Sequence, residues 1–254
     1  MPDACASSCW SGSRVPDLLN TGGSHLEGLS SVAQDYLKVV WNAQEWSSDP
    51  LTVKQLAGRL GVTAGTVSEG VRKLAEAGLI DHARYGQIAL TDRGRQAALA
   101  VVRRHRLIET LLVETFGYGW DEVHEEAEIL EHAISEEFLE RIDVHLGRPS
   151  HDPHGDPIPT ADGEITIPEA HLVSDLEAGA CGIITRVSDA EPELLQRLAA
   201  AGLIPGAHLV VASRDEASAL MVIETRGHAD LGEGQSVSTP FGFPALRAVW
   251  VIPG

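Results

Sequence analysis

The sequence predicts a mainly α-helical protein with small β parts: a winged helix, a helical region and a C-terminal β-barrel-like domain. Three patterns indicate this fold. A helix–turn–helix pattern followed by a hairpin pattern lies within the first hundred residues, and helical periodicity continues over residues 91–146. Short apolar runs separated by Gly-rich turns then fill residues 181–253. With 254 residues, the chain is long enough to bury more than one core.

Composition is that of a soluble globular protein, with 43% hydrophobic and 22% charged residues. No apolar run approaches the length of a membrane span, and the N-terminus lacks the charged-then-apolar pattern of a signal peptide. We therefore expect a cytoplasmic protein with no membrane partner. The three cysteines, Cys5, Cys9 and Cys181, do not form a disulfide framework.

The formal net charge of −18 by itself argues against a nucleic-acid partner. The charges are unevenly distributed, however. Residues 30–106 contain eleven lysines and arginines against seven aspartates and glutamates, so this region is locally basic within an acidic protein. The region is therefore compatible with DNA binding; the alternative is a helix–turn–helix that serves only for packing.

Residues 1–28 are rich in Ser, Gly and Pro, and this composition predicts a disordered leader. An amphipathic helix is expected over residues 29–46, and Asp49-Pro50 ends it. Its predicted apolar face consists of Val32, Tyr36, Val39, Val40 and Ala43.

A helix–turn–helix is predicted next. A short helix over residues 53–60 is broken at Gly61, and Thr63 caps a second helix that runs to about Ala77. The inner face of the motif is predicted to hold Val62, Val67, Val71 and Leu74. The alternation around Tyr85-Gly86 predicts a hairpin, the wing. Small polar and basic side chains on the outer face suit contacts with base edges and phosphates: Thr63, Ala64, Gly65, Thr66, Ser68, Arg72 and Lys73, with Arg84 in the wing.

Three helices are predicted over residues 91–146: one from Thr91-Asp92 to Thr115, one over about 120–129, and one from about 135 to Gly147. They carry more apolar residues than a winged helix needs for its own core. This surplus indicates dimerisation or, alternatively, packing within the chain. The residues concerned are Leu107, Leu111, Leu112, Phe116, Ile129, Leu130, Ile134 and Phe138.

Four side chains spaced 0, 4, 7 and 8 along residues 124–132 would fall on one helical face: His124, Glu128, Glu131 and His132. His105 and Glu109 form a further i, i+4 pair upstream. Imidazoles and carboxylates that converge in this way form a ligand set for a divalent metal. The alternative is an acidic face that is simply solvated.

Residues 149–178 are rich in Pro, Asp and His and predict a linker. His151, Asp152 and His154 have donors for a metal, but an exposed loop is the favoured interpretation.

The ordered combination of the winged helix with the segments VRRHRLIETLLV, GYGWDEVHEEAEILEHAISE and DPHGDPIP resembles the diphtheria-toxin-repressor and iron-dependent-repressor family, and within it the manganese transport regulators of actinobacteria. The resemblance implies a non-enzymatic dimer that represses metal-uptake genes when metal is bound. It also implies a winged helix over residues 29–98, a metal-binding and dimerisation domain over 99–148, and an SH3-like domain of the ferrous-iron-transport type over 179–254.

The resemblance implies two metal sites. Asp35, Glu128, Glu131 and His132 would form a primary site. His105, Glu109 and His124 would form an ancillary site, to which the SH3-like domain would add Asp189. In the iron-sensing branch, Met and Cys occupy the positions of Asp35 and Glu128. Carboxylates at both positions favour Mn²⁺, with Fe²⁺ and other divalent transition metals as alternatives.

The sequence departs from the short manganese regulators at Lys38, where they have a further acidic ligand.

The expected partners are a palindromic double-stranded DNA operator, bound by one or two dimers, and no small-molecule substrate. A hypothesis follows for the metal-free protein: Asp35, Glu128 and Glu131 are unpaired and repel one another, which holds the first helix and the winged helix away from the dimerisation domain or leaves them mobile until metal binds.

Three alternatives stay open at this point: an iron(II)-dependent repressor, a carboxylate-bridged di-metal enzyme, and an accessory protein of iron transport. The enzyme class uses Glu-x-x-His on two helices. The positions three residues before His105, His124 and His132 hold other residues, namely Val102, Asp121 and Ile129.

Overall fold

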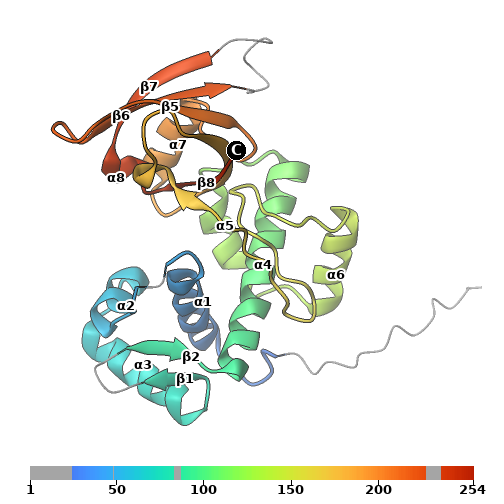
Figure 1. Ribbon diagram of the computed structural model, residues 1–254. Helices are drawn as coiled ribbons and strands as arrows, with labels where there is room; N and C mark the ends of the chain where they lie inside the picture. The colour runs from blue at the N-terminus through green and yellow to red at the C-terminus, as the bar shows by residue number, and fades with distance from the viewer. Residues whose placement is uncertain (1–24, 48, 83–86, 227–235) are drawn as a thin grey trace, which may run out of the picture.

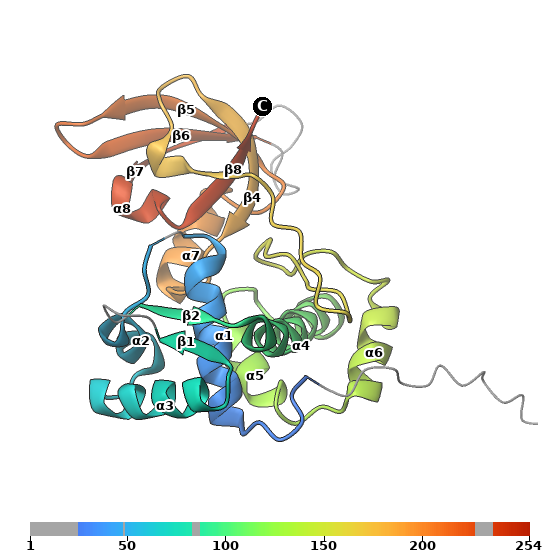
Figure 2. The ribbon, with the colours of Figure 1, turned by 60° about the horizontal axis from the view of Figure 1, so that its bottom comes forward.

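The structure is a computed structural model that describes residues 25–47, 49–82, 87–226 and 236–254. Figures 1 and 2 show a winged helix, in blue to cyan, a β-rich unit, in orange to red, and the green helices beside both. Within these residues, no helix has both the length and the apolar character needed to cross a membrane.

The N-terminal unit has the predicted helix–turn–helix. Thr52 and Thr63 cap helices α2 and α3, and Gly61 ends α2 with a φ of 66°, a left-handed conformation that glycine adopts without strain. The two short strands β1 and β2 pair in antiparallel register, as expected for the base of a wing. Tyr85, Gly86 and the DNA candidate Arg84 lie outside the described residues. The elements are α1 (Ser31–Glu45), α2 (Val53–Leu60), α3 (Ala64–Glu76), β1 (Ile80–His82) and β2 (Ile88–Leu90).

The core of this unit agrees with the predicted pattern at most positions. Val67, Val71 and Leu74 are buried as expected, but Val62 and Val32 are exposed, so their predicted place on the inner faces is wrong. Val62 lies in the turn after the Gly61 cap, where its side chain no longer follows the helical pattern. Leu26, within the predicted leader, is buried in this core.

The central helices carry the site. Helix α4 (Asp92–Phe116) begins at the Thr91 cap, passes without interruption through the predicted domain boundary at residues 98–99, and ends at Gly117. Helices α5 (Val123–Leu130) and α6 (Glu136–His145) pack against it.

The C-terminal unit is a six-stranded antiparallel sheet in the order β3-β8-β4-β5-β6-β7, with its own core. The predicted helical segment is α7, and a bulge interrupts the β4–β8 register at Ile184 and Arg186. The elements are β3 (His171–Leu172), η1 (Val173–Asp175), β4 (Cys181–Val187), α7 (Pro192–Ala200), β5 (His208–Asp215), β6 (Leu220–Arg226), β7 (Ser236–Gly242), α8 (Phe243–Leu246) and β8 (Val249–Pro253).

The segment between α6 and the sheet is not the exposed loop that its composition predicts. His151 is exposed, but Asp152, His154 and Asp156 are buried. Gly155 fixes the segment on β4: its φ is +88°, and an added Cβ would lie 1.9 Å from the carbonyl oxygen of Thr185. The segment therefore joins the β unit to the helices through packed side chains.

Candidate metal centre and nucleic-acid interface

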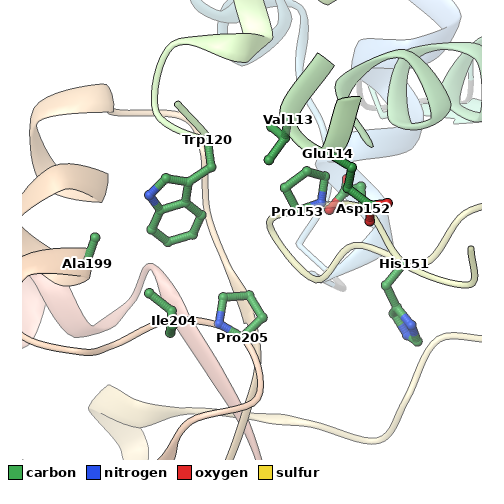
Figure 3. A pocket seen from close by; sticks show the side chains of 9 residues that line it. All are labelled: Val113, Glu114, Trp120, His151, Asp152, Pro153, Ala199, Ile204 and Pro205. Carbon is green, nitrogen blue, oxygen red and sulfur yellow. The ribbon is translucent and has the colours of Figure 1, made fainter. Parts of the chain in front are cut away.

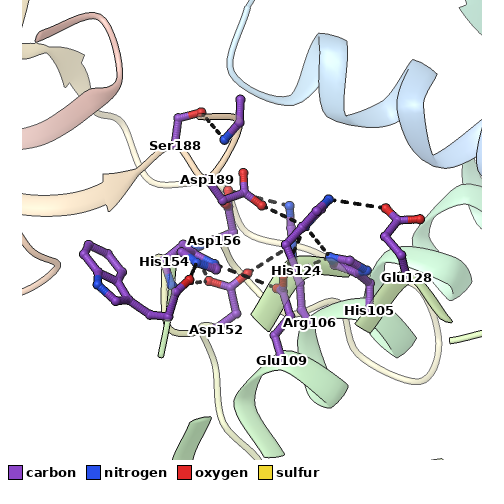
Figure 4. A network of polar contacts seen from close by, with 12 residues as sticks. His105, Arg106, Glu109, His124, Glu128, Asp152, His154, Asp156, Ser188 and Asp189 are labelled. Atoms are coloured by element: carbon purple, nitrogen blue, oxygen red, sulfur yellow. Dashed lines mark hydrogen bonds and ion pairs between the residues drawn. The ribbon is translucent and has the colours of Figure 1, made fainter. Parts of the chain in front are cut away.

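Imidazoles and carboxylates from four parts of the chain meet beside a cavity of about 840 Å³ that His105, Glu109, His124 and Asp189 help to line. Two groups of side chains are distinguished below. The α1–α5 cluster consists of Asp35 in α1 with Glu131 and His132, which directly follow α5. The α4 cluster consists of His105 and Glu109 in α4, His124 in α5 and Asp189 after β4 (Figure 4).

In the α1–α5 cluster, one donor atom of each residue lies within 4.8 Å of the other two. His132 Nε2 is 2.8 Å from Asp35 Oδ1 and 3.4 Å from Glu131 Oε1. His132 Nδ1 lies 3.1 Å from the amide oxygen of Gln34, whose Nε2 donates to the carbonyl of Leu29. Gln34 thereby turns Nε2 of His132 toward the carboxylates, the role that outer partners have around metal-binding histidines. Sequence reasoning did not identify Gln34.

Lys38 overturns the hypothesis of unpaired carboxylates. Its ammonium group lies 2.7 Å from Glu131 Oε1, 2.9 Å from Glu131 Oε2 and 2.7 Å from Glu128 Oε1. The side chains of Lys38 and Glu131 are 3% and 0% exposed. Without metal, this buried cation joins α1 to α5, so repulsion between these carboxylates does not hold the two helices apart.

Glu128 does not join the group that the other three predicted primary ligands form. Glu128 forms a group with His105 and Glu131, whereas Asp35 groups with Glu131 and His132. Three of the four predicted ligands of the primary site thus converge directly, and the fourth, Glu128, contacts the Lys38 ammonium at 2.7 Å.

The α4 cluster is brought together as predicted. His105 Nε2 is 2.9 Å from Glu109 Oε1, and His124 Nδ1 is 3.3 Å from the same oxygen. His124 Nδ1 is also 3.1 Å from Asp189 Oδ2. The other ring nitrogen of His105, Nδ1, lies 2.6 Å from Glu131 Oε2, so His105 connects the two clusters.

His154, which the sequence analysis assigned to an exposed loop, lies at the edge of the α4 cluster. Donor atoms of His154, Glu109 and Asp189 lie within 4.8 Å of one another. A motif of two aspartates and one histidine, DPHGD, was the available signal, but the many Pro and Gly residues around it obscured that signal.

The carboxylates around the histidines favour positive charge there. Burial alone would lower the pKa of His105, but Glu109 and Glu131 raise it to about 9. Burial likewise opposes the effect of Asp189 and Glu109 on His124, and these two carboxylates raise the pKa of His124 to about 10. A divalent cation supplies positive charge to the same position when it binds, and it replaces these protons.

We expect the thermal stability of the chelator-treated protein to fall as the pH rises from 7 to 9.5. The raised pKa values of His105 and His124 mean that their contribution is complete below about 6.5 and is lost as the pH passes 9 to 10. Each kcal/mol lost lowers the melting temperature by about 2–4 °C. Differential scanning fluorimetry in EDTA measures this, and His124→Gln should show a smaller fall. A wild-type melting temperature that stays constant would contradict the assignment.

A second ionic network, centred on Arg106, connects helix α4 of the α4 cluster to the β unit. Arg106 in α4 pairs with Glu45 at 2.6 Å and lies 3.6 Å from both Asp152 and Asp156. Asp156 also accepts from Trp46 Nε1 at 2.8 Å and from Arg186 at 2.6 Å. The end of α1, helix α4, the connecting segment and β4 thus share one buried set of charges.

A separate cavity of about 430 Å³ lies next to this network and is mainly apolar (Figure 3). Trp120 lines this cavity and stacks on the ring of His154, with centroids 5.7 Å apart. The cavity contains none of the predicted metal ligands. It is lined by Val113, Glu114, Trp120, His151, Asp152, Pro153, Ala199, Ile204 and Pro205.

The candidate DNA-contacting face is exposed on α3 and its N-terminal cap. Thr63 caps the helix through the backbone N–H of Thr66, so small polar groups begin the helix. Arg72 pairs with Glu76 at 2.6 Å and Lys73 with Glu69 at 2.8 Å, and all four side chains are exposed. The described residues of this face that are exposed are Thr63, Ala64, Gly65, Thr66, Ser68, Arg72 and Lys73.

The excess of basic residues within residues 30–106 supports a DNA-binding surface less strongly than the sequence alone indicates. Of the ten basic residues within 30–106 that the structure describes, all except Arg84, four are buried: Lys38, Arg103, Arg104 and Arg106. They pair with carboxylates of other segments, for example Arg103 with Asp143 and Arg104 with Glu136. The locally basic composition therefore reflects internal ion pairs as well as surface charge.

Comparison with known proteins identifies the family. The iron dependent repressor N-terminal DNA binding domain matches residues 28–88, the iron dependent repressor metal binding and dimerisation domain matches 91–160, and the FeoA domain matches 171–236. The iron-dependent repressor IdeR of Mycobacterium tuberculosis is 32% identical over 215 residues, which cover 80% of this chain and 92% of that protein. The chain belongs to the iron-dependent repressor family.

Solved structures similar to this repressor include manganese regulators. A structure described as a manganese-dependent transcriptional repressor in complex with manganese has 48% identity and a TM-score of 0.81, covering 87% of this chain and 100% of that chain. The manganese regulator SloR has 29% identity and a TM-score of 0.71, covering 87% and 98%. The diphtheria toxin repressor of Corynebacterium diphtheriae is 34% identical over 137 residues, 54% of this chain and 60% of that protein.

The repressor is therefore a metal-dependent, dimeric, DNA-binding regulator of transcription and not an enzyme. Its winged helix, helical metal-binding domain and C-terminal sheet agree with the predicted fold class. The apolar surplus on the central helices divides into two sets. Leu107 and Leu112 are buried within the protomer, whereas Phe116, Ile129 and Phe138 are exposed and accessible to a second protomer.

Proposed function

We propose that the repressor senses Mn²⁺ and, when loaded, binds a palindromic operator as a dimer to control manganese uptake genes. The chemistry of the donor set carries this proposal. The α1–α5 and α4 clusters contain carboxylate and imidazole groups, and the described residues around them contribute no thiolate or thioether. Oxygen-rich sets suit Mn²⁺, while sulfur ligands favour softer metals. The 48% identity to a protein described as a manganese-dependent repressor supports the same metal.

The position of the clusters suggests how metal and DNA are linked. Asp35 belongs to α1, which packs on α2, α3 and β2 of the winged helix, whereas Glu131 and His132 directly follow α5. A cation held by all three residues adds a connection between these units beside the Lys38 ion pairs. Asp35, half-buried against His132, has its pKa raised by burial, and a divalent cation would stabilise its charged form.

Bound metal shifts the protein toward its DNA-binding form only by its differential affinity for that form. Because Lys38 already holds α1 against α5, we infer that metal fixes the orientation of α1 rather than relieving repulsion. In a dimer, the two α3 helices would then be placed for successive major grooves, about 34 Å apart. One or two dimers would occupy each operator.

The direct test is a fluorescence-anisotropy titration of the promoter DNA of a manganese uptake gene with the full-length protein, at one stated salt concentration, because affinity depends steeply on salt. Mn²⁺ is compared with Fe²⁺ under anaerobic conditions. We expect Mn²⁺ to raise operator affinity at least about tenfold over the chelated protein, equivalent to about 1.4 kcal/mol. Equal or better activation by Fe²⁺ would instead support an iron-dependent repressor, the function of the curated relatives.

The same assay tests the ligand types. The double substitution Asp35→Met and Glu128→Cys introduces the sulfur donors of the iron-sensing branch and should improve the response to Fe²⁺ relative to Mn²⁺. Glu126→Cys, which alters a neighbouring carboxylate outside both clusters, is the matched control. A double variant that still binds DNA with Mn²⁺ and ignores Fe²⁺ would contradict the ligand-type argument.

A further inference from the structure

A third group of metal-binding side chains shares Glu131 with the α1–α5 cluster and His105 with the α4 cluster. This central group consists of His105, Glu128 and Glu131, which each place one donor atom within 4.8 Å of the other two. Glu128 Oε1 also lies 3.4 Å from His124 Nε2, so the central group borders the α4 cluster (Figure 4). Its composition alone would indicate one more metal site.

A lysine already occupies the central group. The Lys38 ammonium lies 2.7 Å from Glu128 Oε1, 2.7 Å from Glu131 Oε1 and 2.9 Å from Glu131 Oε2. His105 Nδ1 lies 2.6 Å from the same Glu131 Oε2. The ammonium group therefore contacts two members of the central group and shares an oxygen with the third.

This ammonium group fills the position that a metal ion would need. The side chains of Lys38 and Glu131 are 3% and 0% exposed, so the charge is enclosed. Oxygen ligands lie about 2.0–2.6 Å from hard divalent cations. A cation bound by Glu128 and Glu131 at such distances would stand where the ammonium now contacts three oxygens of the same two carboxylates. Metal could enter only if Lys38 withdrew, and separating a buried ion pair is strongly unfavourable.

Helix α1 presents two groups of opposite charge to the end of α5. Lys38 follows Asp35 by three residues, so the two side chains lie on the same face of α1. Asp35 Oδ1 lies 2.8 Å from His132 Nε2, whereas Lys38 contacts Glu128 and Glu131. The same face of α1 thus provides a metal ligand and, one turn later, a fixed cation.

The charges between α1 and α5 balance with a single divalent ion. Asp35, Glu128 and Glu131 carry three negative charges, which Lys38 and one Mn²⁺ match. A second Mn²⁺ would leave two uncompensated positive charges among partly buried side chains, which is costly. With a carboxylate in place of the ammonium, four negative charges would balance two divalent ions.

We propose that the Lys38 ammonium takes the place of a metal ion in the central group, so that the repressor binds one Mn²⁺ between α1 and α5 instead of two. This inference rests on the proposed function, because it sets how many Mn²⁺ ions act between these helices. Part of the connection between the winged helix and α5 is then permanent, and one ion at Asp35, Glu131 and His132 adds the rest. The response of these helices to Mn²⁺ follows the occupancy of a single site.

The first test counts Mn²⁺ per protomer in Lys38→Glu. This variant is prepared in Mn²⁺, because its four carboxylates repel one another without metal. The matched control is Lys54→Glu, which makes the same change of charge at an exposed residue of α2. After dialysis against excess Mn²⁺, bound metal is measured by mass spectrometry with inductively coupled plasma. We expect Lys38→Glu to bind one more Mn²⁺ than wild type and Lys54→Glu to bind none in addition. A folded Lys38→Glu protein with the wild-type count would overturn the proposal.

Crystals of the wild-type protein grown in excess Mn²⁺ provide a second measurement that needs no variant. Anomalous scattering at the manganese edge should give a peak beside Asp35, Glu131 and His132 and none within the central group, where Lys38 keeps its contacts. A peak among His105, Glu128 and Glu131, with Lys38 turned away, would overturn the proposal even if Lys38→Glu did not fold.

The two experiments separate the role of Lys38 from the proposed function. Absence of Mn²⁺ from both positions between α1 and α5, together with operator binding that ignores Mn²⁺, would reject the proposed function itself. Mn²⁺ at both positions, with normal Mn²⁺-dependent operator binding, would reject only the substitution of Lys38 for an ion.

Discussion

Replacing Glu131 by Gln should reduce the stability of the metal-free protein by about 3 kcal/mol, because it leaves the buried Lys38 ammonium without its main partner. Both Glu131 oxygens contact Lys38 Nζ, and Oε2 also contacts His105 Nδ1. Burial lowers the pKa of Lys38, but Glu131 and Glu128 raise it above its ordinary value, which favours the charged form of the lysine. Glu128 is half-buried and can compensate only in part.

The measurement is urea unfolding in EDTA, followed by circular dichroism of the helices. The double variant Lys38→Met and Glu131→Gln removes both charges, so it should recover much of the stability that Glu131→Gln loses. A single variant within about 0.5 kcal/mol of wild type, as is usual for exposed sites, would show that this ion pair contributes little. Glu131→Gln should also abolish the increase in operator affinity with Mn²⁺, whereas a Lys38→Met protein retains Asp35, Glu131 and His132.

Local sequence signals determined most of the elements. Thr52, Thr63 and Thr91 each accept a hydrogen bond from the first turn of a helix, and Gly61 ends α2 in the left-handed conformation. Such caps act over three or four residues, so they can be located in a single sequence. The helix–turn–helix and the start of α4 followed from them directly.

Part of the site was equally local. The i, i+4 spacing of His105 and Glu109 places both on one face of α4, and the structure brings them within 2.9 Å of each other. The convergence of His124 with this pair depends on how α5 packs against α4. Helical periodicity predicts which face is apolar but not which residues of two helices meet. The family resemblance supplied that information.

The burial of Lys38 and His154 could not be predicted from the local sequence pattern. Lys38 occupies a position on α1 that a helical wheel assigns to a surface charge, and only the contact with α5 makes it a buried cation. His154 lies in a segment rich in Pro and Gly, whose composition indicates exposure. Its burial arises from contacts with Trp120, 34 residues earlier in the chain, and with Val187 of β4, which lies outside the segment. Long-range packing of this kind is not encoded in local composition.

Replacing Arg106 by Met should be the most destabilising of the substitutions considered, by about 3–5 kcal/mol at pH 8, because it leaves buried carboxylates without their cation. Arg106 contacts Glu45 of α1 and lies close to Asp152 and Asp156 of the connecting segment. Burial raises the pKa of Asp152 to about 8, and the neighbouring Asp156 and Glu109 act in the same direction. The buried carboxyl groups around Arg106 thus disfavour negative charge on Asp152 even when Arg106 is present.

The pH dependence of the stability lost in Arg106→Met distinguishes an uncompensated buried charge from simple loss of packing. A carboxyl group with a raised pKa in the folded state contributes stability at low pH and loses it as the pH rises through that pKa. Arg106 opposes the rise in the pKa of Asp152, so without Arg106 this pKa rises further, and the stability lost should be smaller at pH 5 than at pH 8. Arg141→Met, which removes an exposed arginine paired with Glu137, is the matched control and should change stability by less than about 0.5 kcal/mol.

The same variant tests how the β unit is coupled to the winged helix. Asp156 receives hydrogen bonds from Trp46 after α1 and from Arg186 of β4, so Arg106 completes a bridge between two units that do not share a sheet or a helix. If the bridge matters for regulation, a folded Arg106→Met protein at pH 6 should need more Mn²⁺ than wild type to reach half-maximal operator binding. A destabilisation equal at both pH values, with an unchanged Mn²⁺ requirement, would reduce Arg106 to a packing residue.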